Sequence, residues 1–389
     1  MSDTNPFAEL PAALVDEVLT RTGEIASTLL SSFGQMKTQR ADLRKQLDNS
    51  GLLLSKSDLG YPPAPTTCAT DGSYAIERLL TTDLVAAAAV AVEGLTPPSE
   101  IRHWAYPHHQ VFIAAEPHHE GTSTILRAVM LGRELELALG APHDLVLLDG
   151  TLTLPVIYFN QALNMAPYAP ELKTSQEFLS NIESFFKAYR DLLTSKRNDK
   201  QIASLPKYST RREIGHKIGW PENQDDRGLL TLVLNPGELT KPLPLQQPTN
   251  KTQPSEPTWH FNTKGLKGTL RENIDHLADE IVTALGQVHV FYYKPQSWLP
   301  ALRIEVSSSI ANNNSRLATV VQGLEMQCST PAIMEPYPNY LADRTVKALS
   351  RALPAFRQVT TQHIAENYDG DIGEVFFAMH GYRTDSGRK

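Results

Sequence analysis

The sequence predicts an α/β fold: a mixed sheet with flanking helices, an N-terminal helical arm and a helical insertion. Two observations lead to this prediction. Four strand-like apolar runs lie between residues 67 and 149, and one stretch with helical spacing separates the last run from the others. Long segments with helical spacing also stand at the start and in the middle of the 389 residues. Such a length suits a main domain with sizeable insertions.

The first 60 residues are predicted to form the helical arm. Apolar residues recur at helical spacing from about residue 11 to residue 53, which indicates one or two long amphipathic helices. We expect them to pack against the main domain or a dimer partner; the alternative is that a face carrying Arg40, Arg44 and Lys45 contacts nucleic acid. Tyr61-Pro-Pro-Ala-Pro then forms a stiff linker, so the main domain should span residues 61–389.

The order of elements after the linker predicts the topology. One strand ends at Asp71, and two more follow at 83–93 and 110–115, with connections that suggest an antiparallel meander. A helix is expected over 122–139, with Gly140 as its stop, and a fourth strand over 145–149. Three meander strands, a crossover helix and a fourth strand are the order of a ribonuclease H-like fold.

The rest of the chain is predicted to decorate and complete this core, with insertions at about residues 160–285. Residues 151–200 have largely helical spacing, and residues 235–257 have the composition of a surface loop. Strands are expected at 288–293 and 302–306, and a helix at 315–327. A proline-rich entry at residue 335 then leads into a final helix that carries Asp343.

Composition excludes several classes of protein. Lys and Arg number 36 against 43 Asp and Glu, so the net charge of -7 argues against a general electrostatic trap for nucleic acid. A polyanion would need a local basic channel or a partner that delivers it. The two cysteines, Cys68 and Cys328, lie in apolar surroundings, which indicates a reducing compartment. No apolar run is long enough to span a bilayer, so we expect a cytoplasmic protein that has no membrane among its partners.

Two strand ends carry the pattern with most chemical content. Each apolar run ends in an aspartate that is followed by glycine and a hydroxyl residue, at Asp71-Gly-Ser and Asp149-Gly-Thr. If both runs are strands, the two carboxylates lie at the same end of one sheet. Carboxylate oxygens are the ligands that Mg²⁺ and Mn²⁺ prefer, and phosphodiester hydrolysis uses such ions about 4 Å apart. One Asp-Gly-Ser also makes ordinary turns, but two in one domain favour a metal site.

The crossover helix and the final helix offer further carboxylates. Glu134 and Glu136 lie about 200° apart around the helix, so at most one of them faces the sheet end. We prefer Glu136, and Glu134 stays as the alternative. Asp343 is the fourth candidate, although a carboxylate near a helix start also serves as a dipole partner. The histidine pairs at 108–109 and 118–119 suggest a zinc site, but adjacent histidines on a strand point to opposite faces and cannot easily share one ion, so zinc is not expected.

Other catalytic motifs are absent from the sequence. There is no Gly-x-x-x-x-Gly-Lys-Ser/Thr and no Gly-x-Gly-x-x-Gly, so no standard nucleotide-binding loop is present. Gly-x-Ser-x-Gly is absent as well, so a serine triad has no nucleophile elbow. If DNA has to be moved, another protein must supply the energy.

The ordered set of motifs resembles the NurA nucleases, which process DNA ends together with the hexameric HerA translocase. The resemblance covers roughly residues 65–350, and each motif alone is unspecific. The matching segments are Thr70-Asp-Gly-Ser, Arg133-Glu-Leu-Glu136, Leu147-Leu-Asp-Gly-Thr151, Leu205-Pro-Lys-Tyr-Ser209, Arg303-Ile-Glu305 and Tyr337-Pro-Asn-Tyr-Leu-Ala-Asp343.

The resemblance implies a ribonuclease H-like nuclease core, dependence on Mn²⁺ (or Mg²⁺), a homodimer with a narrow DNA channel, and docking onto a HerA-like ATPase. Carried over by position, the metal ligands would be Asp71, Glu136 and Asp149, with Asp343 as a fourth. The chain departs from the family at Asp343, where histidine is frequent, and at Glu335, where tyrosine is frequent. Basic residues that would face DNA phosphates are Lys207 and Arg211.

The leading hypothesis is therefore a metal-dependent DNA nuclease, acting as an endonuclease or exonuclease on DNA ends in repair or phage defence. Two alternatives remain. One is a catalytically weak scaffold or regulatory subunit of the translocase complex, which the departures at Glu335 and Asp343 favour. The other is a different ribonuclease H-like nuclease, such as a resolvase or an RNase.

Overall fold

A computed structural model describes residues 11–246, 259–381 and 383–387. Within these residues one mixed sheet has eleven strands, nine of them in the order β1-β7-β9-β10-β6-β5-β2-β3-β4, while β11 pairs with β2 and β8 with β9. The strands are β1 (Leu53–Ser55), β2 (Thr67–Arg78), β3 (Asp83–Glu93), β4 (His108–Glu116), β5 (Leu145–Asp149), β6 (Gln201–Leu205), β7 (Glu238–Thr240), β8 (Leu243–Pro244), β9 (His289–Lys294), β10 (Leu302–Val306) and β11 (Arg383–Gly387).

The half of the sheet that holds the paired aspartates confirms the ribonuclease H-like topology. Strands β2, β3 and β4 form an antiparallel meander, and the crossover helix α2 (Thr122–Gly140) returns the chain to β5. Strand β5 runs parallel to β2, and β6 runs parallel to β5. The resulting spatial order, β4-β3-β2-β5-β6, places the first meander strand next to the strand after the helix.

The predicted end of the first strand at Asp71 is wrong, because β2 continues to Arg78. Gly72-Ser73 makes no turn, since β3 pairs with β2 without a break from Cys68 to Arg78. Strand β5 accompanies only the first residues of β2, up to Thr70, and β11 pairs with β2 from Tyr74 onward. Asp71 therefore lies on β2 just where β5 ends and before β11 begins.

The other half of the sheet contains strands that the sequence did not predict. Strand β6 directly follows a stretch with helical spacing and basic residues. Its five residues are all buried, but the polar Gln201 and Ser204 interrupt the apolar pattern that would predict a buried strand. The predicted loop at 235–257 contains β7 and β8, which extend the sheet through β9. Residues 247–258 of that loop lie outside the described residues. The strands predicted at 288–293 and 302–306 are confirmed as β9 and β10.

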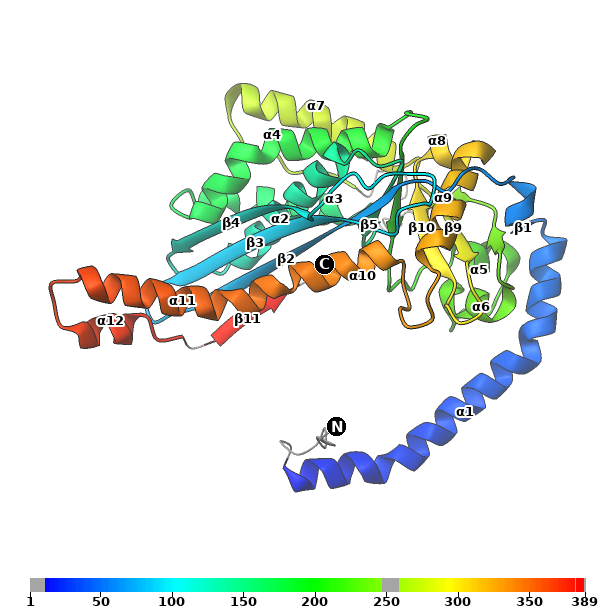
Figure 1. The fold of residues 1–389 in the computed structure, drawn as a ribbon, viewed down its shortest axis with the longest axis horizontal. Coiled ribbons are helices and arrows are strands. Elements are labelled where there is room, and N and C mark those ends of the chain that lie inside the picture. The colour runs from blue at the N-terminus through cyan, green and yellow to red at the C-terminus, as the bar shows by residue number, and fades with distance from the viewer. Residues whose placement is uncertain (1–10, 247–258, 382, 388–389) are drawn as a thin grey trace.

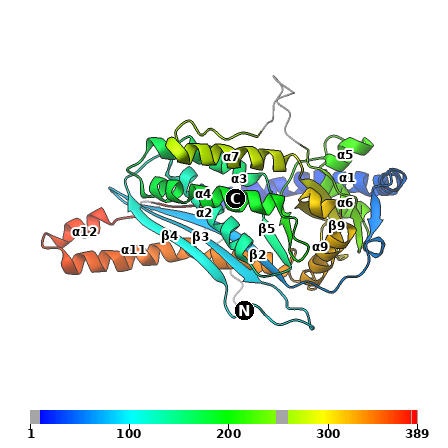
Figure 2. The same ribbon diagram turned by 90° about the horizontal axis from the view of Figure 1, so that it is seen from above.

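Helices cover both faces of the sheet (Figures 1 and 2). On one face α2, α4 and α7 stack outward from the strands, and on the other α10 and α11 lie along β2 and β3. The described helices after α2 are α3 (Leu154–Leu163), α4 (Lys173–Thr194), α5 (Glu213–Ile218), α6 (Asp226–Val233), α7 (Gly268–Leu285), α8 (Ser308–Ala311), α9 (Asn314–Gln327), α10 (Tyr337–Val346), α11 (Ala348–Asn367) and α12 (Ile372–Ala378), with short 3₁₀ turns at Lys56–Asp58 and Ala166–Tyr168. The main apolar core lies on the α2 side, and a second one lies under α9.

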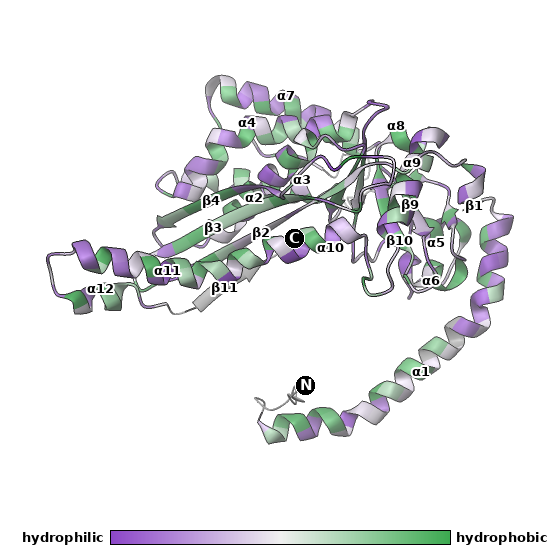
Figure 3. Cartoon of the chain, viewed as in Figure 1, coloured by the Kyte–Doolittle hydropathy of each residue, from purple (hydrophilic) through white to green (hydrophobic). Residues whose placement is uncertain are grey.

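The arm is one helix, α1 (Ala12–Asn49), whose C-terminal end alone packs on the domain (Figure 1). Leu43 and Leu47 are buried, and Arg44 forms an ion pair with Glu238 at 2.7 Å. Arg44 thus ties the arm to β7, and the nucleic-acid role of the face with Arg40 and Lys45 stays a prediction. The rest of α1 projects away with hydrophobic residues on its surface (Figure 3). Strand β1, within the range predicted as the arm, pairs with β7.

None of the described helices combines the length and the apolar character that a bilayer crossing requires.

A buried histidine at the opposite end of β5 predicts a stability change with pH. His143 is fully buried, and its Nε2 lies 3.5 Å from Glu93 Oε2. Burial lowers the pKa of His143 from 6.5 to about 4, which outweighs the attraction of Glu93. Between these two values the unfolded chain binds more protons than the native chain, so the free energy of unfolding falls as pH decreases. The free energy of unfolding, measured by urea titration, should be roughly 1–2 kcal/mol lower at pH 5 than at pH 7 because of this group. His143→Gln should remove this contribution. An unchanged difference in the variant would contradict this assignment.

Candidate metal centre

The two strand-end aspartates are neighbours in the sheet. Parallel pairing of β2 with β5 aligns Thr70 with Leu148, and Asp71 and Asp149 are the next residue on each strand. Adjacent strands lie about 4.8 Å apart and side chains in register share a face, so both carboxylates point the same way. In each case the following glycine donates its N–H to the aspartate Oδ1, at 2.8 Å for Asp71 and 2.9 Å for Asp149. Asp71 is only 5% exposed.

The loop after Asp149 is fixed by hydrogen bonds from several elements. Gly150 has φ +85°, a conformation that glycine adopts without strain. Its carbonyl accepts from Ser204 Oγ at 2.7 Å. Glu305 Oε2 accepts from Thr151 Oγ1 at 2.6 Å and from the Leu152 N–H at 3.0 Å. The direction of the Asp149 carboxylate therefore depends on the neighbouring strands β6 and β10.

Glu305 belongs to a buried ion network that the sequence did not reveal. Arg303 contacts Glu305 Oε1 at 3.2 Å, and its two terminal nitrogens bind Glu213 at 2.8 and 2.9 Å. Burial disfavours the charged form of Arg303, but Glu213 and Glu305 outweigh burial and raise its pKa. Burial likewise disfavours a charged Glu213, and Arg303 nevertheless holds the pKa of that carboxyl below its usual value. The motif Arg303-Ile-Glu305 indicated the arginine and one glutamate, whereas no sequence signal indicated Glu213.

Glu134, and not Glu136, points toward the sheet, beside the two strand ends that carry the aspartates. Glu134 is 2% exposed, and its Oε2 would lie 3.4 Å from a Cβ placed on Gly72. It also lines a small cavity together with Asp149 and Thr151. Glu136 points toward α4, where its carboxylate accepts a hydrogen bond from Ser184 at 2.7 Å. We call Asp71, Glu134 and Asp149 the carboxylate cluster.

The preference for Glu136 was wrong because α2 has two packed faces. One face lies on β2 and β3, and the other lies against α4. Glu136 was preferred because it lies on one stripe with Val129 and Arg133. That stripe does not mark the side facing the sheet, because Arg133 forms an ion pair with Glu177 of α4. A helix that is covered on two sides has no single apolar stripe from which its orientation can be read.

The two glutamates provide a matched pair for testing the cluster. If the predicted metal-dependent cleavage takes place at this cluster, Glu134→Gln should lower it by roughly ten- to hundredfold or more, the range typical when a metal-supporting group is removed. Glu136→Gln should keep activity within about twofold, because its carboxylate lies on the α4 side of the helix, where it accepts a hydrogen bond from Ser184. Initial rates on one labelled oligonucleotide at saturating Mn²⁺ give both numbers. Equal losses in the two variants would contradict the assigned orientation.

A lysine neutralises the open side of the cluster. Lys207 Nζ lies 3.3 Å from Asp149 Oδ2 and 2.9 Å from Glu335 Oε2. Burial lowers the pKa of Lys207, but Asp149, Glu335 and Asp343 together outweigh burial and raise it. Asp343 is buried on α10 and forms an ion pair with Lys347. The two positions that depart from the resembled family, Glu335 and Asp343, therefore each have a lysine partner.

Arg211, the second residue predicted to contact DNA, lies in the loop between β6 and α5. Its guanidinium donates to the backbone carbonyl of Gln246. The structure thus brings Lys207 to Asp149, whereas Arg211 contacts the chain segment that follows β8.

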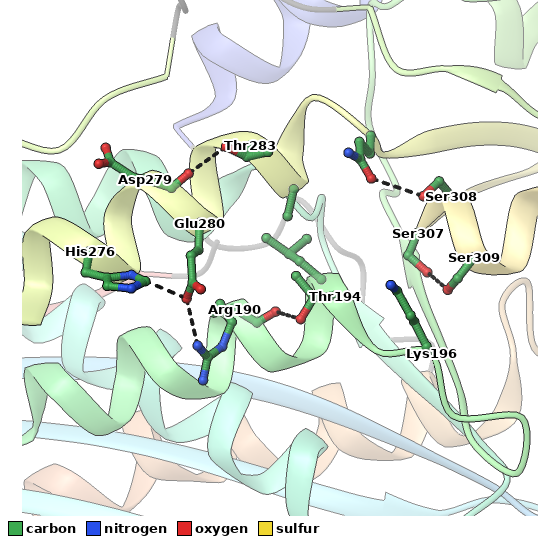
Figure 4. Close-up of a pocket in the computed structure, with 13 residues that line it drawn as sticks. Arg190, Thr194, Lys196, His276, Asp279, Glu280, Thr283, Ser307, Ser308 and Ser309 are labelled. Carbon is green, nitrogen blue, oxygen red and sulfur yellow. Dashed lines mark hydrogen bonds and ion pairs between the residues drawn. The ribbon is translucent and has the colours of Figure 1, made fainter.

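A larger cavity elsewhere contains none of the predicted site residues (Figure 4). It has a volume of about 760 Å³ and lies between α4, α7 and the start of α8. Arg190 of α4 reaches Glu280 of α7 across it at 2.7 Å, which ties the two helices together. Its size alone does not make it the catalytic site.

The donor chemistry of the carboxylate cluster fits a hard divalent cation. Asp71, Glu134 and Asp149 offer only carboxylate oxygens, and such groups repel one another unless a cation lies among them. The Lys207 ammonium already lies against one of them. Within residues 11–246, 259–381 and 383–387, no three His, Cys, Asp or Glu side chains already surround one point at coordination distance. Metal binding would therefore have to draw the carboxylates together.

Comparison with known proteins identifies the fold. No protein-family profile and no curated protein sequence matches the chain. Among solved structures, the NurA nuclease from Sulfolobus solfataricus is similar, with a TM-score of 0.57, 12% identity, and coverage of 92% of this chain and 99% of that one. A second NurA structure gives a TM-score of 0.53 at 13% identity, with coverage of 92% and 99%. NurA bound to dAMP and manganese gives 0.50 at 12% identity, covering 84% and 93%. The fold that the resemblance implied is confirmed.

Proposed function

We propose that this chain, which has the fold of the NurA nucleases, is a divalent-metal-dependent deoxyribonuclease that processes DNA ends. The observation that carries the proposal is the register of β2 against β5, which makes Asp71 and Asp149 neighbours next to the buried Glu134. The fold supports the same activity, since its neighbours include NurA nucleases, one of them bound to dAMP and manganese.

In this proposal Asp71, Glu134 and Asp149 hold Mn²⁺ or Mg²⁺, and Asp343 completes the ligand set from α10. The bound ion would activate water and stabilise charge on the phosphate oxygens. The protein's own contribution is to fix the carboxylates: the Gly72 and Gly150 N–H groups orient the two aspartates, and Glu305 holds the loop after Asp149. Burial of Asp71 and Glu134 keeps bulk water away from these two carboxylates and strengthens the charge interactions that they make.

Lys207 and Arg211 are the proposed contacts to DNA phosphates. Lys207 stands at the edge of the carboxylate cluster, and its ammonium can exchange a carboxylate oxygen for a phosphate oxygen of similar charge. Positive charge at this point offsets repulsion between the phosphate backbone and an acidic site, which matters in a chain with a net charge of -7.

We further propose that the nuclease acts as a homodimer with a HerA-like hexameric ATPase, in the cytoplasm, in DNA repair or phage defence. The chain lacks a nucleotide-binding loop of its own. The projecting part of α1 exposes Leu14, Val18, Ile25 and Phe33, and a partner that covers them would remove this apolar surface from water. Light scattering at several concentrations, with and without the first 40 residues, tests the dimer.

A substrate panel tests the proposed activity. Labelled single-stranded DNA, double-stranded DNA and RNA are incubated with Mn²⁺, Mg²⁺ or EDTA. Cleavage of DNA that needs the ion and stops in EDTA supports the proposal. Preferred cleavage of RNA would favour a different ribonuclease H-like enzyme.

One observation favours a catalytically weak scaffold as the second candidate. Lysines already neutralise Asp343 and Glu335, so fewer carboxylates beside the cluster are available to hold a second ion. No cleavage with any ion in the substrate panel, together with binding to a HerA-like ATPase, would favour this candidate.

A further inference from the structure

A small cavity adjoins the carboxylate cluster on the side of Lys207. It has a volume of about 220 Å³, and loop 205–208, α6, the start of β10 and the entry to α10 form its walls. Lys207 and Glu335 line this cavity and also form the ion pair at the cluster. A molecule bound in the cavity would therefore be in contact with the edge of the proposed catalytic site. We call it the Asn339 cavity.

Asn339 of α10 is the unusual residue in its wall. The side chain is 3% exposed, and among the described residues neither its Nδ2 nor its Oδ1 has a hydrogen-bond partner. A buried amide without partners destabilises the folded protein, because it has lost its hydrogen bonds to water and gained none. One donor group and one acceptor, side by side, are thus available to a ligand with the complementary pair.

The size and the other walls of the cavity restrict the ligand. A volume of about 220 Å³ is less than the usual volume of a pocket for a drug-sized molecule. Tyr208 lines the cavity with 95% of its surface exposed, so its ring offers a free face for stacking. Arg227 lines it too, and its guanidinium donates to the carbonyls of Ala301 and Lys207, which fixes the backbone that carries the lysine.

We propose that the Asn339 cavity binds one unpaired nucleobase of the DNA strand whose phosphate lies at Lys207. This inference rests on the proposed function. Each base has an edge with a donor next to an acceptor, and amide side chains pair with such edges. Recognition of single strands combines this contact with aromatic stacking and a cation for the phosphate. The cavity presents these three groups as Asn339, Tyr208 and Lys207, so it selects a strand end whose last base is unstacked.

Binding of mononucleotides without metal tests the cavity directly. The four deoxynucleoside monophosphates and 2-deoxyribose 5-phosphate are titrated into the full-length protein in EDTA, with binding followed by NMR. We expect the nucleotides to bind at least about fivefold more tightly than the sugar phosphate, the lower limit for one good pair of hydrogen bonds to a base. Equal affinity for sugar phosphate and nucleotides would overturn the proposal.

Asn339→Leu separates the base contact from the phosphate contact. Leucine has a similar shape but no polar atoms, so nucleotide affinity should fall to that of the sugar phosphate while the melting temperature rises. Asn198→Leu, at an exposed position on another loop, is the matched control. It should change neither the affinity for nucleotides nor the ratio of that affinity to the affinity for sugar phosphate. Nucleotide affinity that stays at the wild-type value in Asn339→Leu would contradict the assignment.

Tyr208→Ala provides a test that does not depend on a buried substitution. We expect it to weaken nucleotide binding severalfold and to leave sugar phosphate binding unchanged; equal weakening of both would contradict a stacking role. Cleavage of DNA by the wild-type protein in Mn²⁺ is measured separately. If the protein cleaves DNA but binds nucleotides and sugar phosphate equally well, only the proposed base site in the cavity is rejected. If it binds nucleotides more tightly but does not cleave DNA, only the proposed nuclease activity is rejected.

Discussion

Asp71→Asn should abolish metal-dependent cleavage of DNA, with a loss of well over about a hundredfold, because residues that merely support metal ligands already cost ten- to hundredfold. Asn keeps the shape of Asp71 and one acceptor for the Gly72 N–H, but it removes the negative charge that the ion requires. Initial rates at saturating Mn²⁺ provide the measurement.

The control for this prediction is Asp199→Asn. Asp199 lies on the exposed loop before β6, where it pairs with Arg197, and its replacement should leave the cleavage rate unchanged. Circular dichroism and thermal melting establish that Asp71→Asn is folded. Cleavage that survives in a folded Asp71→Asn variant would remove Asp71 from the site.

Arg303→Met should be the most destabilising single substitution near the site. It leaves the buried Glu213 and Glu305 without their common cation, and breaking a buried pair in this way costs about 3–5 kcal/mol. Urea unfolding at pH 7 measures the loss. Activity should fall as well, because Glu305 then no longer holds the Thr151 and Leu152 groups in the same position.

The matched control is Arg197→Met, which removes an arginine from an exposed ion pair. Solvent and salt already screen Arg197 and Asp199, so the urea midpoint should not change measurably. Equal midpoints for Arg303→Met and Arg197→Met would show that the buried network does not stabilise the fold.

Local sequence signals predicted the central part of the fold well. The apolar runs of β3 and β5 are buried along their length, so composition alone indicates strands. The spacing of α2 and the glycine at its end indicated its bounds, and the order of these elements determined the topology. Asp149 was correctly placed because its strand does end there.

Elements whose structure depends on distant partners could not be predicted in the same way. Strand β2 passes through Gly72-Ser73 because β3 pairs along its whole length, and no local residue encodes that pairing. Strand β6 is defined by β5 and β10 on its two sides. Glu213 reaches Arg303 across 90 residues of sequence, so only the folded chain reveals the pair.

The most direct test of the central claim is to locate the metal ion. Crystals of the protein grown or soaked with Mn²⁺ are measured at the manganese absorption edge, and the anomalous map gives the ion's position independently of any activity. We expect a peak with oxygens of Asp71 and Asp149 at about 2.0–2.6 Å and with Glu134 on its other side. A peak that lies away from both aspartates, or no peak at saturating Mn²⁺, would contradict the account.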